Sequence, residues 1–208
     1  MREDFNEMAA NWDQEPRRLE RAKTVANEIV NAIPDLGRMK GLEYGCGTGL
    51  LSFCLQPFLQ HLTLVDNAQG MLDVVKQKIE NEMICNMNPL LLDLSEDENT
   101  CKGSYDLIYT LMALHHIPDI DKIIFSFSDM LNSFGYLCIA DLDEEDGSFH
   151  GEGFDGHNGF NRYELTEKLK KYGFENISWK ICYQNRRKIK DGTEKIYPVF
   201  LMIGQKKD

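Results

Sequence analysis

Glycines stand at every second position in a short segment near the start of the chain, Gly45, Gly47 and Gly49, with Glu43 just before them. An apolar run precedes this segment and a helical pattern follows it, so we expect a turn from a strand into a helix. Glycines leave the backbone of such a turn accessible to a ligand, and the first N–H groups of the following helix lack partners inside that helix. A dinucleotide-binding turn has the spacing G-x-G-x-x-G, but Leu50 occupies the place of its third glycine. The spacing therefore disfavours NAD as the ligand.

Acidic residues follow several predicted strands, which is where ligands of open parallel sheets bind. Asp66 comes 17 residues after Gly49 and ends a predicted strand, so its carboxylate can accept both hydroxyls of a ribose. The alternative is that Asp66 caps the helix predicted from Ala68. Asp93 follows the next strand, where it can accept a hydrogen bond from an adenine amino group or cap a turn.

Histidines are the candidates for acid–base chemistry. His115 and His116 follow the fourth predicted strand. The long loop 142–160 is rich in glycine, histidine and phenylalanine, and we interpret it as a mobile lid over a small acceptor; a solvated acidic loop is the alternative. The lid residues expected to face the acceptor are Phe149, His150 and His157. The histidines and carboxylates of this loop match no metal-binding spacing, so no metal is expected.

Alternating strand and helix patterns position these residues. Strands are predicted at 42–44, 61–66, 89–93, 106–109 and 136–140, with helical patterns between them. Such repeats produce a doubly wound parallel sheet, and the third strand is apolar enough to be buried on both faces. The last two strands, 174–183 and 196–203, can pair antiparallel because a short connection joins them. The fold class is therefore α/β, with a mostly parallel seven-stranded sheet and an antiparallel C-terminal strand pair.

Prolines and capping residues predict where helices begin. Pro16 and Pro118 are each expected to open a helix, and Asn161 is expected to cap one that stops at Gly173. The basic cluster 186–190 is followed by Asp191 and Gly192, which predicts a solvated hairpin tip. A binding patch is the alternative for this cluster.

Charge and composition argue against several partners. The 208 residues carry a net charge of −11, which repels nucleic-acid phosphates and anionic membranes. No apolar run approaches the roughly 20 residues that cross a bilayer, and the polar N-terminus does not resemble a secretory signal. Six cysteines without a C-x-x-C pair suggest neither a zinc site nor a disulfide framework. We expect a cytoplasmic monomer or homodimer with no nucleic-acid partner and no membrane insertion.

Taken in order, these motifs resemble those of a known family. The glycine segment, Asp66, Asp93 and the stretch 105–117 together resemble class I S-adenosylmethionine-dependent methyltransferases, small-molecule type, which includes enzymes of ubiquinone and menaquinone biosynthesis. The opening segment from Phe5 to Asp13 is similar to that group as well. The resemblance implies one Rossmann-like domain over 1–208, in which N-terminal helices within 1–36 cover the cofactor.

The resemblance also implies roles for individual residues toward S-adenosylmethionine. The methionine part would lie on the glycine turn, with Trp12 over the cofactor and Glu43 beneath the turn, which comprises Gly45, Cys46, Gly47, Thr48 and Gly49. Asp66 would hold the ribose, and the adenine would be contacted by Asn67, Met71, Asp93 and Leu94. Thr110 would begin the loop near the sulfonium. Cys46 could instead be a nucleophile, although we interpret it as a small residue whose backbone matters.

The reaction that the resemblance implies is methyl transfer to a small-molecule acceptor by in-line displacement. Most of the acceleration can come from aligning the reactants, and a base is required only if the acceptor must lose a proton. His116 and His150 are the candidates for that base, and the expected acceptor contacts are His115, Phe149 and His157. Two alternatives stay open: a catalytically silent cofactor-binding module that regulates a partner, and an NAD-dependent oxidoreductase.

Overall fold

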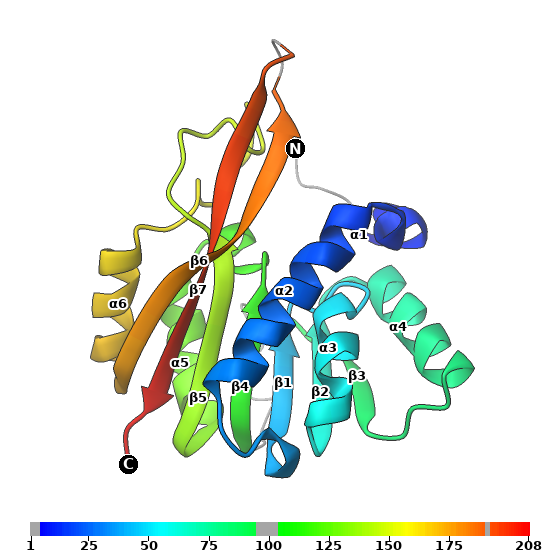
Figure 1. Cartoon of the computed structure of the whole chain (residues 1–208), viewed down its shortest axis with the longest axis vertical. Helices are drawn as coiled ribbons and strands as arrows, with labels where there is room; N and C mark the ends of the chain where they lie inside the picture. Colours follow the sequence, from blue (N-terminus) through cyan, green and yellow to red (C-terminus); the bar gives the residue numbers. More distant parts are fainter. Residues whose placement is uncertain (1–4, 95–103, 190–191) are drawn as a thin grey trace.

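The protein was analysed as a computed structural model that describes residues 5–94, 104–189 and 192–208, and these form a layered α/β fold (Figure 1). The strands are β1 (Lys40–Tyr44), β2 (His61–Asp66), β3 (Met87–Leu91), β4 (Tyr105–Leu111), β5 (Leu131–Leu142), β6 (Phe174–Lys188) and β7 (Glu194–Lys206). The α-helices are α1 (Phe5–Met8), α2 (Pro16–Ala32), α3 (Leu50–Leu55), α4 (Gln69–Asn81), α5 (Ile120–Met130) and α6 (Arg162–Lys171). Short 3₁₀-helices are η1 (Ala9–Gln14), η2 (Leu36–Arg38), η3 (Gln56–Phe58) and η4 (Leu114–His116).

In the described residues the strands form one sheet in the order β3-β2-β1-β4-β5-β7-β6. β1 to β5 pair in parallel, whereas β7 lies antiparallel to both β5 and β6. The fold class predicted from the sequence is therefore confirmed. β1 pairs with β2 on one side and β4 on the other, so chain connections leave it in opposite directions. Ligands of such sheets bind at this switch point.

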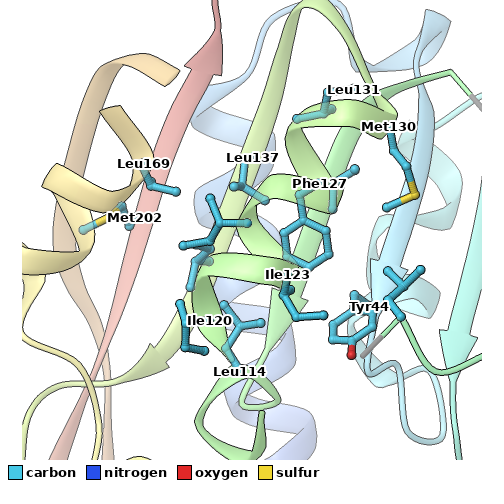
Figure 2. Close-up of a cluster of buried hydrophobic side chains, with 14 of the residues drawn as sticks. Tyr44, Leu114, Ile120, Ile123, Phe127, Met130, Leu131, Leu137, Leu169 and Met202 are labelled. Atoms are coloured by element: carbon cyan, nitrogen blue, oxygen red, sulfur yellow. The ribbon is translucent and has the colours of Figure 1, made fainter. Parts of the chain in front are cut away.

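Alternate residues of the central strands pack into two separate cores, one on each face of the sheet. Leu107 and Tyr109 of β4 join a core with residues of α2, α3 and α4. Ile108, between them, joins the opposite core with residues of α5 and α6. Figure 2 shows that second core, in which Phe127 of α5 lies near Tyr44 of β1. The two apolar layers make the strand ends a firm support for the loops that follow them.

Several boundaries predicted from the sequence are wrong, and neighbouring residues explain two of them. The third strand spans Met87–Leu91 rather than 89–93, and as an edge strand it leaves Leu91 52% exposed instead of burying both faces. Pro89 is tolerated there because an edge strand has fewer backbone donors to satisfy. The helix expected to open at Pro118 begins at Ile120, because the side chain of Asp119 accepts the N–H of Lys122 and acts as the N-cap.

Other local predictions hold. Pro16 occupies the first turn of α2, and the Asn161 side chain accepts the N–H groups of Tyr163 and Glu164 at the start of α6. β5 is longer than predicted, and β6 and β7 continue beyond it as a two-stranded ribbon (Figure 1). The ribbon ends in a turn in which the Gly192 N–H donates to the Ile189 carbonyl; the rest of the predicted tip, 190–191, lies outside the described residues.

Candidate active site

A cavity of about 540 Å³ opens at the carboxyl ends of β1, β2 and β4. Four parts of the chain contribute to its wall: the N-terminal helices, the glycine turn, the strand ends and the loop after β5. Those residues of the wall that were predicted to bind a cofactor are Trp12, Glu43, Gly45, Cys46, Gly47, Thr48, Asp66, Asn67, Met71 and Asp93. The tertiary structure thus brings together residues that lie far apart in the sequence.

The glycine turn packs tightly against Ala113 on one side and is open to the cavity on the other. Gly45 has φ +67°, and a Cβ atom on it would lie only 2.4 Å from the Cβ of Ala113. The Cys46 N–H donates to the carbonyl of Val65 at 2.9 Å and so ties the turn to β2. On the cavity side, a Cβ on Gly47 would meet nothing nearer than Trp12 Nε1 at 3.8 Å. The backbone of the turn therefore faces the cavity without intervening side chains.

Glu43 lies beneath the turn and connects β1 to the start of α3. Its carboxylate accepts the backbone N–H of Ser52 at 3.1 Å and also the Ser52 hydroxyl. That hydroxyl lies 2.7 Å from the phenol oxygen of Tyr109 in β4. Burial raises the pKa of Glu43 to about 8, in spite of the two hydrogen bonds from Ser52. The side chain thus holds the glycine turn from below.

The Asp66 carboxylate is bound by backbone N–H groups on both sides. One oxygen accepts from Gly47 N at 2.7 Å and the other from Ala68 N at 2.9 Å. The N-cap position of α4 is Ala68, so Asp66 is not the capping residue that the alternative interpretation required. Burial raises the pKa of Asp66, and its hydrogen bonds from Ala68 and Gly47 oppose that rise.

Asn67 and Asp93 lie side by side at the cavity, where Asn67 Nδ2 donates to Asp93 Oδ2 at 3.0 Å. A carboxylate can accept several hydrogen bonds, and Asp93 lies in the cavity wall. Three other predicted cofactor residues, Gly49, Leu94 and Thr110, are buried and are not part of the cavity wall.

Cys46 has the environment of a packing residue. The thiol is buried, and burial together with the nearby carboxylates of Asp66 and Glu43 raises its pKa well above the usual value. Because the thiolate is the nucleophilic form, this environment disfavours the alternative in which Cys46 attacks a substrate.

The N-terminal helices close one side of the cavity. Asp13 Oδ1 lies 2.5 Å from the Thr48 hydroxyl, and Lys78 Nζ lies 3.0 Å from Asp13 Oδ2, so η1 is tied to the glycine turn and to α4. The Arg18 guanidinium lies 3.6 Å above the ring of Trp12. These contacts place Trp12 firmly in the cavity wall.

Two arginines of α2, Arg18 and Arg21, also line the cavity, and sequence reasoning missed them. Arg21 donates to Asn185 Oδ1 at 3.0 Å, while its buried Nε atom has no hydrogen-bond partner among the described residues. Burial lowers the pKa of Arg21 to about 10, which leaves it charged at neutral pH. The signal that could have found both residues is their three-residue spacing beside the apolar stripe of α2. The cavity therefore presents a positive charge on this side.

A cluster of histidines borders the cavity. His115 is 1% exposed, and its Nδ1 atom lies 2.5 Å from Oδ1 of the fully buried Asp141. Burial would raise the pKa of Asp141, but the charge and hydrogen bond of His115 outweigh it and hold that pKa below its usual value. The rings of His115 and His116 lie 4.2 Å apart, and the ring of His150 lies 5.1 and 5.2 Å from them. Of these three, His116 is in the cavity wall.

The loop after β5 approaches the cavity through residues other than those predicted. Phe154 and Asp155 line the wall, and the ring of Phe154 stacks on His150 at 3.9 Å. Phe149 packs instead against Tyr197, with ring centroids 5.1 Å apart. The His157 N–H donates to the carbonyl of His115 at 2.7 Å, and its Nε2 lies 2.9 Å from the Ile117 carbonyl. Phe149 and His157 therefore hold the loop in place, and neither lies in the cavity wall.

Comparison with known proteins adds family information to this geometry. The sequence model of a family described as "Methyltransferase domain" matches residues 14–191. An uncharacterized methyltransferase of Schizosaccharomyces pombe is 29% identical over 153 residues, which cover 66% of this chain and 54% of that protein. A ubiquinone biosynthesis O-methyltransferase of Marinobacter nauticus is 24% identical over 149 residues, which cover 70% of this chain and 63% of that protein. The match spans less than two thirds of either relative.

Solved structures share the fold. The phosphoethanolamine N-methyltransferase 2 of Haemonchus contortus, in complex with phosphomonomethylethanolamine and S-adenosylhomocysteine, superimposes with a TM-score of 0.71 at 15% identity. The superposition covers 89% of this chain and 52% of that one. At this identity the likeness concerns the arrangement of strands and helices. Among the described residues, no helix is both long and apolar enough to cross a membrane.

Proposed function

This chain belongs to the methyltransferase-domain family, and from that premise we propose that it transfers a methyl group from S-adenosylmethionine to a small-molecule acceptor. The observation that carries the proposal is a cavity whose wall contains the glycine turn, Asp66 and Asp93 together with His116 and Phe154. The first of these groups offers backbone and carboxylates to a nucleoside, and the second offers imidazole and aromatic groups to another molecule.

The cofactor would lie against the first of these groups. In this proposal the backbone of the turn holds the methionine part, and the charged side chain of Arg21 or Arg18 neutralises its carboxylate. Asp66 accepts the ribose hydroxyls, and its bonds to Gly47 and Ala68 already fix the direction of its oxygens. Asn67 and Met71 flank the adenine, with Asp93 at its edge. Leu94, Gly49 and Thr110 act indirectly, by packing behind the wall.

The acceptor would lie between the sulfonium and the histidine cluster. Methyl transfer requires the acceptor atom, the methyl carbon and the sulfur in line, and holding that alignment away from water supplies most of the acceleration. The half-buried residues Met112, which has φ +56°, and Ala113 line the cavity in this region. His116 is the group placed to take a proton from the acceptor, and His150 supports it from behind. The ubiquinone O-methyltransferases among the relatives make phenols the first class of acceptor to test.

Calorimetric titration tests the cofactor assignment. We expect S-adenosylmethionine and S-adenosylhomocysteine to bind and NADH not to bind, and Asp66→Ala to weaken binding about tenfold or more, the value of one good charge-assisted hydrogen bond. Asp73→Ala is the matched control, because Asp73 is an exposed carboxylate on the neighbouring helix α4. Binding of NADH alone would overturn the proposal in favour of an oxidoreductase.

Turnover separates an enzyme from a silent binding module. Incubation with S-adenosylmethionine and the phenol 3,4-dihydroxybenzoate should release S-adenosylhomocysteine. His116→Ala should lower that release while leaving cofactor affinity unchanged. A protein that binds the cofactor but methylates neither this phenol nor a panel of amines, thiols and carboxylates would favour the regulatory module.

A further inference from the structure

Three imidazoles converge beside the cavity in a way that suits a metal ion. One nitrogen from each of His115, His116 and His150 can be chosen so that all three lie within 4.8 Å of one another. An ion at the centre of such a triangle would lie at most about 2.8 Å from each nitrogen, whereas zinc–nitrogen bonds are about 2.0–2.1 Å. Side-chain rotations that move each nitrogen by less than about 1 Å would bring it to the distance of a zinc–nitrogen bond.

One ring nitrogen of His115 has a buried carboxylate as its partner. This nitrogen, Nδ1, is engaged by Asp141, so the other ring nitrogen, Nε2, is the one that can bind an ion. Asp141 is itself held by the backbone N–H groups of Leu142 at 2.7 Å and His115 at 3.3 Å. Histidines that bind metals commonly have a carboxylate on the second nitrogen, which fixes the ring and makes it a better donor.

Aromatic packing explains less of the arrangement of the three histidines than a metal site does. The stacking of His150 on Phe154 accounts for the position of one ring. It does not account for a fully buried carboxylate directed at the far side of His115, since burying a charge costs free energy unless an opposite charge or several donors compensate it. Asp141 already has hydrogen bonds to the His115 ring and to the backbone N–H groups of Leu142 and His115, and a divalent cation on the cluster would add an opposite charge to them.

We propose that His115, His116 and His150 form a binding site for a divalent transition-metal ion of the zinc class, with Asp141 as its supporting carboxylate. Imidazole donors favour zinc and its neighbours over magnesium or calcium, which prefer oxygen ligands. Three protein ligands leave a fourth position for water or substrate, as in catalytic zinc sites. The sequence-based expectation of no metal considered only the spacing within loop 142–160, whereas these ligands come from two segments.

The place of the site suggests its use. His116 lies in the cavity wall, so the fourth ligand position borders the cavity. If the proposed methyl transfer is correct, an acceptor hydroxyl or thiol bound there would lose its proton to solvent more readily and become a better nucleophile. In the metal-bound state His116 would act as a ligand, and the ion would take the place of His116 as the group that activates the acceptor. That role depends on the proposed function, but the binding of the ion does not.

Metal binding is tested on the full chain after dialysis against a chelator. Zinc is titrated in competition with a chromophoric chelator, and cobalt(II) is used as a visible-absorption probe. We expect one equivalent of either ion on the wild-type protein. His116→Ala and His150→Phe should weaken binding about 100-fold or more, since each removes a ligand; the phenylalanine keeps a ring against Phe154. His61→Ala is the control, because His61 lies at the amino end of β2, away from the cavity.

Two results would overturn the metal site: no stoichiometric binding to the wild-type protein, or equal binding by the two ligand variants. If a variant does not fold, as judged by circular dichroism, X-ray absorption of the zinc-loaded wild-type protein decides, with three imidazoles expected at about 2.0–2.1 Å. Titration of the same samples with S-adenosylhomocysteine keeps the two proposals separate. Metal binding without cofactor binding would refute the proposed function alone, and the reverse result would refute the metal site alone.

Discussion

Substitution of Gly45 by alanine should destabilise the protein far more than the same substitution at Gly47. Both residues have positive φ, +67° and +53°, so each alanine must adopt a left-handed conformation that costs about 1–2 kcal/mol. The two positions differ in what the added methyl group meets. At Gly45 it would lie 2.4 Å from the Cβ of Ala113, but at Gly47 its nearest neighbours are at 3.8 and 4.0 Å.

The contact at Gly45 sets the size of the difference. Carbon atoms pack at about 3.5–4.0 Å, and Ala113 has no side-chain torsion that could move its Cβ away. The backbone around Ala113 must therefore shift, and overpacking of this kind costs about 1–3 kcal/mol. We expect Gly45→Ala to lower the free energy of unfolding by about 2–5 kcal/mol in total, and Gly47→Ala by about 1–2 kcal/mol.

Urea denaturation followed by circular dichroism measures both values, and thermal melting should show Tm shifts of about 2–4 °C for each kcal/mol. Calorimetry with S-adenosylhomocysteine measures the affinity for the ligand. For each kcal/mol of stability lost, Gly47→Ala should lower this affinity more than Gly45→Ala. The methyl group at Gly47 faces the cavity beside Trp12 and Met71, so Gly47→Ala should lower affinity although it stays folded. Equal destabilisation by the two substitutions, within about 0.5 kcal/mol, would refute the argument that close packing on Ala113 holds the turn.

Three further outcomes follow from the described contacts. Glu43 has a pKa of about 8 when folded against an ordinary 4.5, so the stability it contributes is fully present below about pH 4.5 and is lost as pH rises to about 8. Between these pH values, the free energy of unfolding of Glu43→Gln should therefore rise by roughly 3–4 kcal/mol relative to that of the wild-type protein, as measured by urea denaturation. A difference between the two proteins that does not change with pH would contradict the assignment. Asp119→Ala removes the N-cap of α5 and should cost about 1 kcal/mol, measured as a Tm decrease of about 2–4 °C with cofactor affinity unchanged. Cys46→Ala should keep the rate of methyl transfer within about threefold of the wild-type rate, because the buried thiol acts through packing. Complete loss of turnover in a folded variant would instead support Cys46 as a nucleophile.

Much of the fold could be predicted from the sequence, because its elements depend on residues that are close together in the chain. The alternation of strands and helices, the proline at the start of α2 and the asparagine cap of α6 each depend on residues within a few positions of one another. The antiparallel pairing of β6 with β7 followed from the short connection between them. The boundaries that failed were those decided by neighbours in space. Strand 89–93 has an apolar sequence, but among the described residues no strand pairs with the outer edge of β3, and Leu91 is exposed.

The site divides in the same way. The spacing of the glycines and the acidic residues at the ends of β1 and β2 marks the nucleoside end of the cavity from sequence alone, because parallel strands all direct their carboxyl ends to one edge. The other end was decided by tertiary structure. Arg21 enters the wall because α2 packs across β6, and Phe154 rather than Phe149 enters it because His157 ties the loop to the backbone of His115. The convergence of His150 with His115 and His116 has the same origin: a loop joins a strand end only through contacts distant in sequence, and no local pattern encodes them.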